Sequence, residues 1–147
     1  SILASVVRVF GGGIADRAGG ERTALAALGL MMVGGLGLTL TASFPAAVVS
    51  VILLAIGMGV TNAAVFKLVP QEIPQAVGGA AGWVGGLGAF GGFAIPPVMG
   101  QAVTAFGRPG YAFGFVVFVF LAAASMVMAL ALRIGRPAEV SRDIRPA

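Results

Sequence analysis

Arg8 is the residue whose surroundings most suggest chemistry, because it interrupts the apolar start of the run SVVRVFGGGIADRAGGER at residues 5–22. If a membrane helix ends near Asp16, the intervening eight residues at ~1.5 Å each put Arg8 roughly 12 Å inside the boundary. That depth is near the midplane of a hydrocarbon core ~30 Å thick, where a charge is costly. The guanidinium then either snorkels to the interface or faces a polar cavity and binds an anion.

The absence of a counter-ion favours the anion-binding interpretation of Arg8. No Asp or Glu lies in the predicted membrane segments to neutralise its charge. This is expected where the substrate itself is the counter-ion. The guanidinium fork suits planar oxyanions such as nitrate, nitrite or carboxylate, which accept two parallel hydrogen bonds from it.

A glycine-rich stretch, GGAAGWVGGLGAFGGFAIPP at 78–97, is the second candidate. Its residues from Gly86 to Gly91 match the dinucleotide-binding pattern G-x-G-x-x-G. No strand is predicted before the pattern, and no acidic residue lies between Glu72 and Glu139 to bind a ribose. These two absences exclude a dinucleotide site. Small residues recur at helical spacing and predict a groove for another helix. The bare backbone also allows a small substrate to approach, which makes candidates of Gly82, Gly85, Gly86 and Gly88.

Asn62, in the middle of a predicted span, needs hydrogen-bond partners and can meet either another helix or the substrate. The chain contains no Cys and no His, so we predict no metal site built on those residues and no cofactor. GGGIADRAGGER at 11–22 lacks the G-K-[ST] of a phosphate-binding loop. Its glycines instead allow two helices to meet closely at one membrane edge.

The composition indicates an integral membrane protein. Of 147 residues, 59% are hydrophobic and only 10% are charged, and the mean hydropathy is +1.04. Soluble domains carry about 25% charged residues. A water-soluble fold of this size could not hide so much apolar surface.

Apolar stretches divide the chain into four full membrane spans and the end of a fifth. We predict that residues 1–15 end one helix, and that full spans cover 23–43, 47–66, 76–105 (interrupted by Pro96-Pro97) and 111–132. The predicted connections are a charged loop at 16–22, turns at 43–46 and 106–110, and a polar loop at 67–75. Residues 1–135 form the membrane domain and 136–147 a polar cytoplasmic tail.

The charges give an orientation. If the loop at 16–22 is cytoplasmic, seven basic residues fall inside and only Arg108 outside. The inside set is Arg17, Arg22, Lys67, Arg133, Arg136, Arg142 and Arg145. The net charge of +4 is therefore explained by topology and predicts no nucleic-acid partner. Because the chain begins with Ser inside an apolar run, we expect it to be a fragment whose N-terminal part is missing.

These features together resemble the nitrate/nitrite porter family of the major facilitator superfamily. GGGIADRAGGER is similar to the superfamily's cytoplasmic motif, here in its second-half copy, with Gly12, Asp16, Arg17, Gly20 and Arg22 as the gating residues. The position of Arg8 before it is similar to the family's substrate-binding arginine. GWVGGLGAFGGFAIP resembles the glycine-rich nitrate signature of the eleventh helix, and VFKLVPQEIP the end of the tenth.

The resemblance implies the C-terminal half of a twelve-helix transporter in the bacterial cytoplasmic membrane, with a cytoplasmic C-terminus. Its partners are nitrate and nitrite anions, the lipid bilayer and the missing N-terminal half, which supplies a second arginine. We expect nitrate uptake or nitrate/nitrite exchange by alternating access. The alternatives are a porter for another small organic anion or a sugar, and a truncated, non-transporting membrane fragment. An enzyme is disfavoured, because the membrane segments offer no acid, Cys or His.

Overall fold

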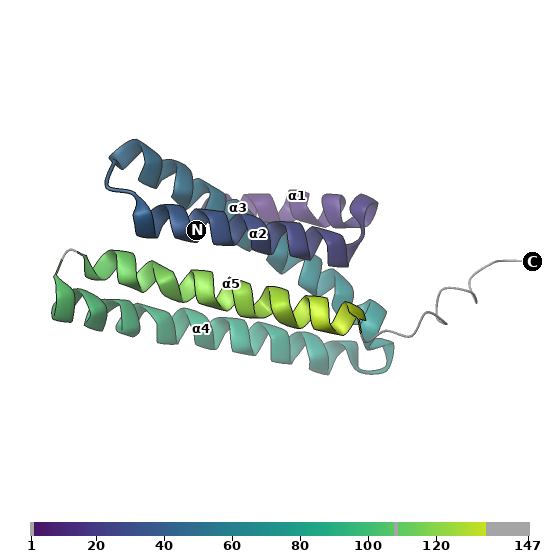
Figure 1. Ribbon diagram of the computed structural model, residues 1–147. Coiled ribbons are helices and arrows are strands. Elements are labelled where there is room, and N and C mark those ends of the chain that lie inside the picture. The colour runs from purple at the N-terminus through teal and green to yellow at the C-terminus, as the bar shows by residue number, and fades with distance from the viewer. Residues whose placement is uncertain (1, 108, 135–147) are drawn as a thin grey trace, which may run out of the picture.

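The chain folds into helices joined by very short connections (Figure 1). The computed structural model describes residues 2–107 and 109–134. Their elements are α1 (Ile2–Ala18), α2 (Gly20–Leu40), α3 (Phe44–Glu72), a 3-10 turn η1 (Pro74–Ala76), α4 (Val77–Phe106) and α5 (Gly110–Ile134). The predicted tail at 136–147 lies outside the described residues.

Four of these helical segments are long and apolar enough to cross a membrane. They are Gly20–Leu40, Phe44–Glu72, Pro74–Phe106 and Gly110–Ala131. Helix α1, with 17 residues, precedes them. Within the described residues no strand occurs, and the predicted all-α class with four full membrane spans is confirmed.

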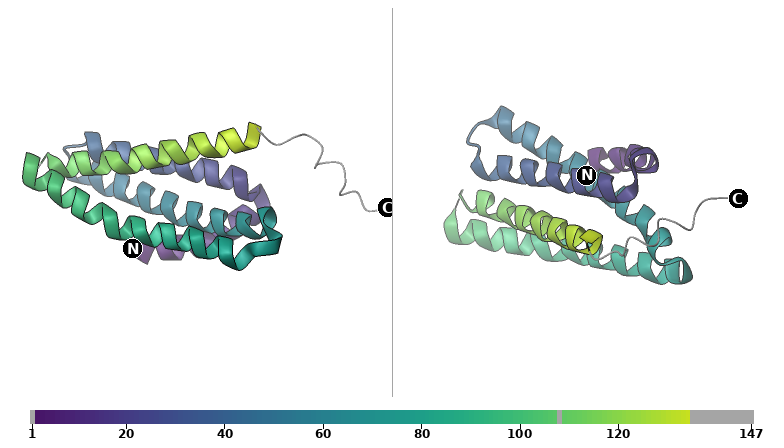
Figure 2. Two further views of the ribbon diagram at one scale, coloured as in Figure 1. Left: turned by 90° about the horizontal axis from the view of Figure 1, so that it is seen from below. Right: turned by 45° about the vertical axis from the view of Figure 1, so that its right-hand side comes forward.

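Helix α3 is the centre of the first group of helices, and α5 joins that group to α4. Helix α3 packs most extensively against α2 and also along α1, while α5 contacts both α2 and α4. Figures 1 and 2 show the resulting arrangement, with the α4–α5 hairpin lying beside the group made of α1, α2 and α3. Helix α4 therefore lies at the margin of the bundle, and none of its residues is buried.

Small residues hold the first group together, as is usual where lipid removes the hydrophobic drive for helix association. Ala15, Ala24 and Ala64 form a buried cluster where α1, α2 and α3 meet. A Cβ at Gly34 would lie only 2.6 Å from the Leu54 backbone nitrogen. Among the described residues no large side chain is completely buried, so close backbone contact rather than a bulky core stabilises this packing.

The predicted loop at 16–22 is wrong, because a single residue joins α1 to α2. Gly19 adopts φ 87°, a conformation that side-chain-bearing residues rarely adopt, and this reverses the chain at once. Its nitrogen donates to the Ala15 carbonyl, and its own carbonyl accepts the first bond of α2 from the Thr23 nitrogen, both at 3.1 Å. Helix α1 therefore continues to Ala18, beyond the predicted end near residue 15.

The predicted loop at 67–75 is mostly helix as well. Helix α3 continues to Glu72 with Pro70 inside it, and only Ile73 and the short turn η1 separate it from α4. Proline removes one backbone donor, which costs the helix a single hydrogen bond, and the helix nevertheless continues past it to Glu72.

Prolines elsewhere also differ from the prediction. Pro96-Pro97 do not interrupt α4, which is continuous from Val77 to Phe106. Pro45 lies in the first turn of α3, where its missing N–H would have no helical partner anyway. The turn predicted at 43–46 is therefore already helix from Phe44 onward.

Candidate functional site

Arg8 and Asn62, two of the predicted site residues, line one pocket between α1 and α3. The pocket measures about 170 Å³, and its other lining residues are Ala4, Ser5, Met58 and Gly59. Both polar side chains are exposed. A guanidinium and an amide therefore share an open pocket whose lining contains no acidic residue.

Gly59 sets how closely the two walls of this pocket approach. A Cβ at Gly59 would lie 2.5 Å from the Ala4 carbonyl oxygen and 3.3 Å from the Arg8 nitrogen. No side chain fits there unless α1 moves away from α3. Gly59 thus places the backbone of Arg8 directly against α3.

Phe66 supports the Arg8 side chain from α3. The centre of the guanidinium lies 5.5 Å from the centroid of the Phe66 ring, within the range of a cation–π interaction. A contact of this kind orients the guanidinium and partly compensates its charge without a carboxylate. Its hydrogen-bonding edge remains available to an anion.

Gly85 connects α4 to this arrangement. A Cβ at Gly85 would lie 3.9 Å from the tip of the Phe66 ring, so the glycine lies beside the ring that supports Arg8. Phe66 thus lies between Arg8 of α1 and Gly85 of α4.

The other predicted glycines are not part of this pocket. Gly82 and Gly86 line a separate hollow of about 420 Å³ on α4, together with Gly78, Gly79, Trp83 and Leu87. Gly88 belongs to neither lining, and nothing lies within 4 Å of a Cβ placed there. The described part of the chain leaves this glycine-rich face of α4 open.

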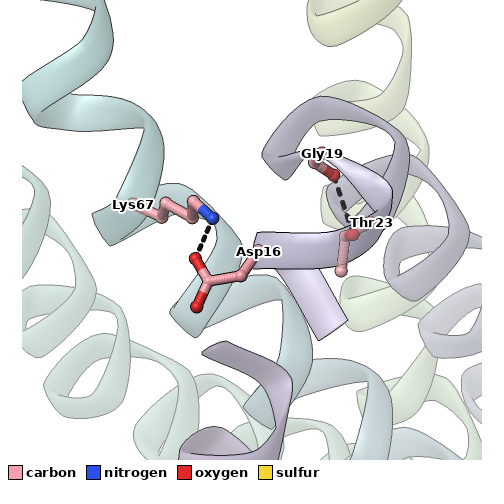
Figure 3. Close-up of polar contacts among 4 residues, drawn as sticks. All are labelled: Asp16, Gly19, Thr23 and Lys67. Atoms are coloured by element: carbon pink, nitrogen blue, oxygen red, sulfur yellow. Dashed lines mark hydrogen bonds and ion pairs between the residues drawn. The ribbon is translucent and has the colours of Figure 1, made fainter. Parts of the chain in front are cut away.

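Four of the predicted gating residues, Asp16, Arg17, Gly20 and Arg22, lie within three residues of the α1–α2 junction at Gly19, and Figure 3 shows Asp16 there. Asp16 forms an ion pair with Lys67 of α3. Gly20 is buried against Leu68, whose side chain would meet a Cβ at 2.9 Å. Arg17 and Arg22 are exposed, and a Cβ at Gly12 would meet nothing within 4 Å. Asp16 and Gly20 thus tie this end of α1 and α2 to α3.

Sequence reasoning overlooked Phe66 and Lys67 as partners of site residues. Phe66 follows Asn62 by four residues, which places both on one helix face, and this spacing was the available signal. The predicted loop at 67–75 includes Lys67 and therefore hides its helical register towards Asp16. Among residues 2–107 and 109–134 no group of three or more His, Cys, Asp or Glu side chains could hold a metal ion.

The sequence matches the family model described as Major Facilitator Superfamily over residues 1–146. The chain belongs to the major facilitator superfamily. This agrees with the helical architecture and with the resemblance drawn from the residues around Arg8.

Similar proteins carry nitrate or nitrite in their names. A probable nitrate/nitrite antiporter, NarK1, of Thermus thermophilus is 44% identical over 80 residues, covering 54% of this chain and 18% of that protein. A probable nitrate transporter, NarT, of Staphylococcus epidermidis is 29% identical over 126 residues, covering 85% of this chain and 33% of its own length. The nitrite extrusion protein of Bacillus subtilis is 28% identical over 128 residues, covering 87% of this chain and 32% of that protein.

These alignments confirm the resemblance to nitrate/nitrite porters. They also show that the aligned part of this chain spans a third or less of each of these relatives. No solved structure matches the chain.

Proposed function

We propose that this chain is part of a transporter that moves nitrate and nitrite across the bacterial cytoplasmic membrane, by uptake or exchange. The observation that supports this most is the pocket that Arg8 and Asn62 both line and whose lining contains no acidic residue. A guanidinium held by an aromatic ring, with no carboxylate beside it, attracts a planar anion. The names of the similar proteins supply the substrate.

The transport cycle requires a second half. The described helices place one arginine beside an open pocket, and the glycine-rich face of α4 is uncovered. In our proposal the remaining part of the transporter supplies the opposing wall and a second arginine. The two halves then rock about the anion, so that the site opens to one side of the membrane at a time.

The charges support an orientation with the α1–α2 junction in the cytoplasm. Arg17, Arg22 and Lys67 lie at this end of the described bundle, and the positive-inside rule assigns such an end to the cytoplasm. The C-terminus would then also be cytoplasmic. Asp16 and Lys67, with Gly12, Arg17, Gly20 and Arg22, would form the cytoplasmic gating region.

Exchange in proteoliposomes tests the proposal. The complete transporter containing this chain is reconstituted into vesicles loaded with nitrite, and nitrate uptake is followed for the parent and for Arg8→Lys. Lysine keeps the positive charge but loses the two-pronged donor geometry. We expect the parent to exchange and Arg8→Lys to lose at least about tenfold in uptake, since one charge-assisted hydrogen bond contributes roughly 1.5–3 kcal/mol.

Two results would contradict the proposal at different points. If the parent takes up no nitrate, the substrate assignment is wrong. If Arg8→Lys is as active as the parent, Arg8 is a snorkelling or structural charge. Arg108→Lys, in the turn predicted outside the spans, serves as the matched control and should retain parental uptake.

A carboxylate is the second candidate substrate, because its two oxygens match the same fork. Adding formate or acetate in excess to the uptake assay separates the two. Competition by either carboxylate at concentrations comparable to nitrate would favour a porter for small organic anions.

A further inference from the structure

A groove between α1, α2 and α3 lies apart from the pocket proposed to bind the transported anion. It measures about 420 Å³ and is lined by Ile14 and Ala18 of α1, by Arg22, Ala26 and Leu30 of α2, and by Val60 of α3, among others. It shares no lining residue with the Arg8 pocket. Apart from Arg22 and Thr23 its lining is apolar.

The polarity of the groove changes in one direction along α2. Arg22 lies in the first turn of α2, beside the chain reversal at Gly19. Leu30 lies eight residues further along, which is roughly 12 Å deeper at ~1.5 Å per residue. The groove is therefore cationic at the membrane surface and apolar towards the membrane interior, the order in which a phospholipid presents its headgroup and acyl chain.

Arg22 has capacity for a ligand. It is exposed, and within residues 2–107 and 109–134 no ion pair or hydrogen bond engages its guanidinium. The carboxylate of Asp16, at the same end of the bundle, forms an ion pair with Lys67. The hydroxyl of Thr23 donates to the Gly19 carbonyl at 2.8 Å (Figure 3), which leaves Arg22 as the donor at the mouth of the groove.

We propose that this groove binds one anionic phospholipid, with its phosphate on Arg22 and an acyl chain along Ala18, Ala26 and Leu30. Guanidinium groups form paired, charge-assisted hydrogen bonds with phosphate oxygens. Basic pockets between membrane helices are the setting in which anionic headgroups bind. Alanines at 18 and 26 keep the groove wall thin, so that a chain lies between α1 and α2.

Photocrosslinking in vesicles tests the proposal on the complete transporter. Vesicles contain a trace of phosphatidylglycerol or of phosphatidylcholine, each carrying a diazirine in the acyl chain, and mass spectrometry locates the labelled residues. We expect phosphatidylglycerol to label residues 14–30 about fivefold more than phosphatidylcholine, since one arginine near the surface contributes about that factor. Arg22→Gln removes the preference, and Arg22→Lys keeps most of it.

A second variant tests the groove itself. Ala26→Phe fills the groove and reduces labelling by both lipids, whereas Ala131→Phe, on an exposed position of α5, leaves it unchanged. Thermal unfolding of both variants verifies that they fold. Three outcomes would each overturn the proposal. The two lipids could label the groove equally, or Arg22→Gln could keep the preference for phosphatidylglycerol. Residues 14–30 could also remain unlabelled because another segment of the transporter fills the groove.

Discussion

Replacing Gly59 by alanine tests whether the contact between α1 and α3 sets the position of Arg8. The added Cβ would lie 2.5 Å from the Ala4 carbonyl oxygen, whereas ordinary contact begins at 3.4 Å. Helix α1 must therefore move by roughly 0.9 Å, and overpacking of this kind costs about 1–3 kcal/mol. A displacement of that size spoils the alignment of a directed pair of hydrogen bonds. We expect the KM for nitrate to rise about tenfold.

The assay is initial nitrate uptake by the reconstituted transporter, with thermal unfolding measured in parallel. Gly34→Ala is the matched control, because its Cβ would meet the Leu54 nitrogen at 2.6 Å, in the contact between α2 and α3. It should lower the melting temperature and leave the KM unchanged. Gly100→Ala, with nothing within 4 Å and in the interior of α4, should keep the parental KM and should not lower the melting temperature. If Gly59→Ala and Gly34→Ala lower stability and share the parental KM, the close contact does not position Arg8.

Three further predictions concern the neighbours of the site. Phe66→Leu removes the ring over Arg8 and should raise the KM for nitrate about three- to tenfold. Phe66→Tyr keeps the ring and should keep the parental KM. Equal KM values in the two variants would argue against a cation–π role. Gly85→Leu should displace the Phe66 ring and raise the KM in the same uptake assay, because even a Cβ would lie 3.9 Å from it, while Gly88→Leu enters open space and should not. Lys67→Gln should lower the melting temperature by no more than a few degrees, since Asp16 is 68% exposed and such ion pairs contribute less than about 1 kcal/mol. A much larger fall in the melting temperature would mean that this pair stabilises the bundle far more than its exposure suggests.

The helices were predictable because membrane spans depend on length and hydropathy alone, and both are local properties of the sequence. Their ends were not. Residues 16–22 are polar and rich in glycine, features shared by loops and by tightly capped helix ends, and only the φ of Gly19 distinguishes them. Residues 67–72 contain Pro70 and two charges, yet the helix continues through them. Proline and charged residues disfavour a helix interior without excluding it, so these residue types alone do not fix where α3 ends.

The candidate site was predictable in its polar members and not in its apolar ones. Arg8 and Asn62 stand out because polar side chains in apolar spans are rare, and they do share a pocket. Phe66 was missed because an aromatic residue in a membrane helix is ordinary. Gly59 was missed because its role is a distance between two backbones, which depends on how α1 and α3 pack.

The one-residue connection at Gly19 bears on how movements of α1 could be measured by spectroscopy. A connection of one residue keeps the last turn of α1 beside the first turn of α2, so a displacement of that end of α1 also displaces α2. Arg8 lies on α1, while α2 contacts α3 and α5 and has residues such as Val33 more than half exposed on its surface. A spectroscopic label on the outer face of α2 would therefore follow displacements of α1, which carries the proposed anion ligand Arg8, without touching that residue.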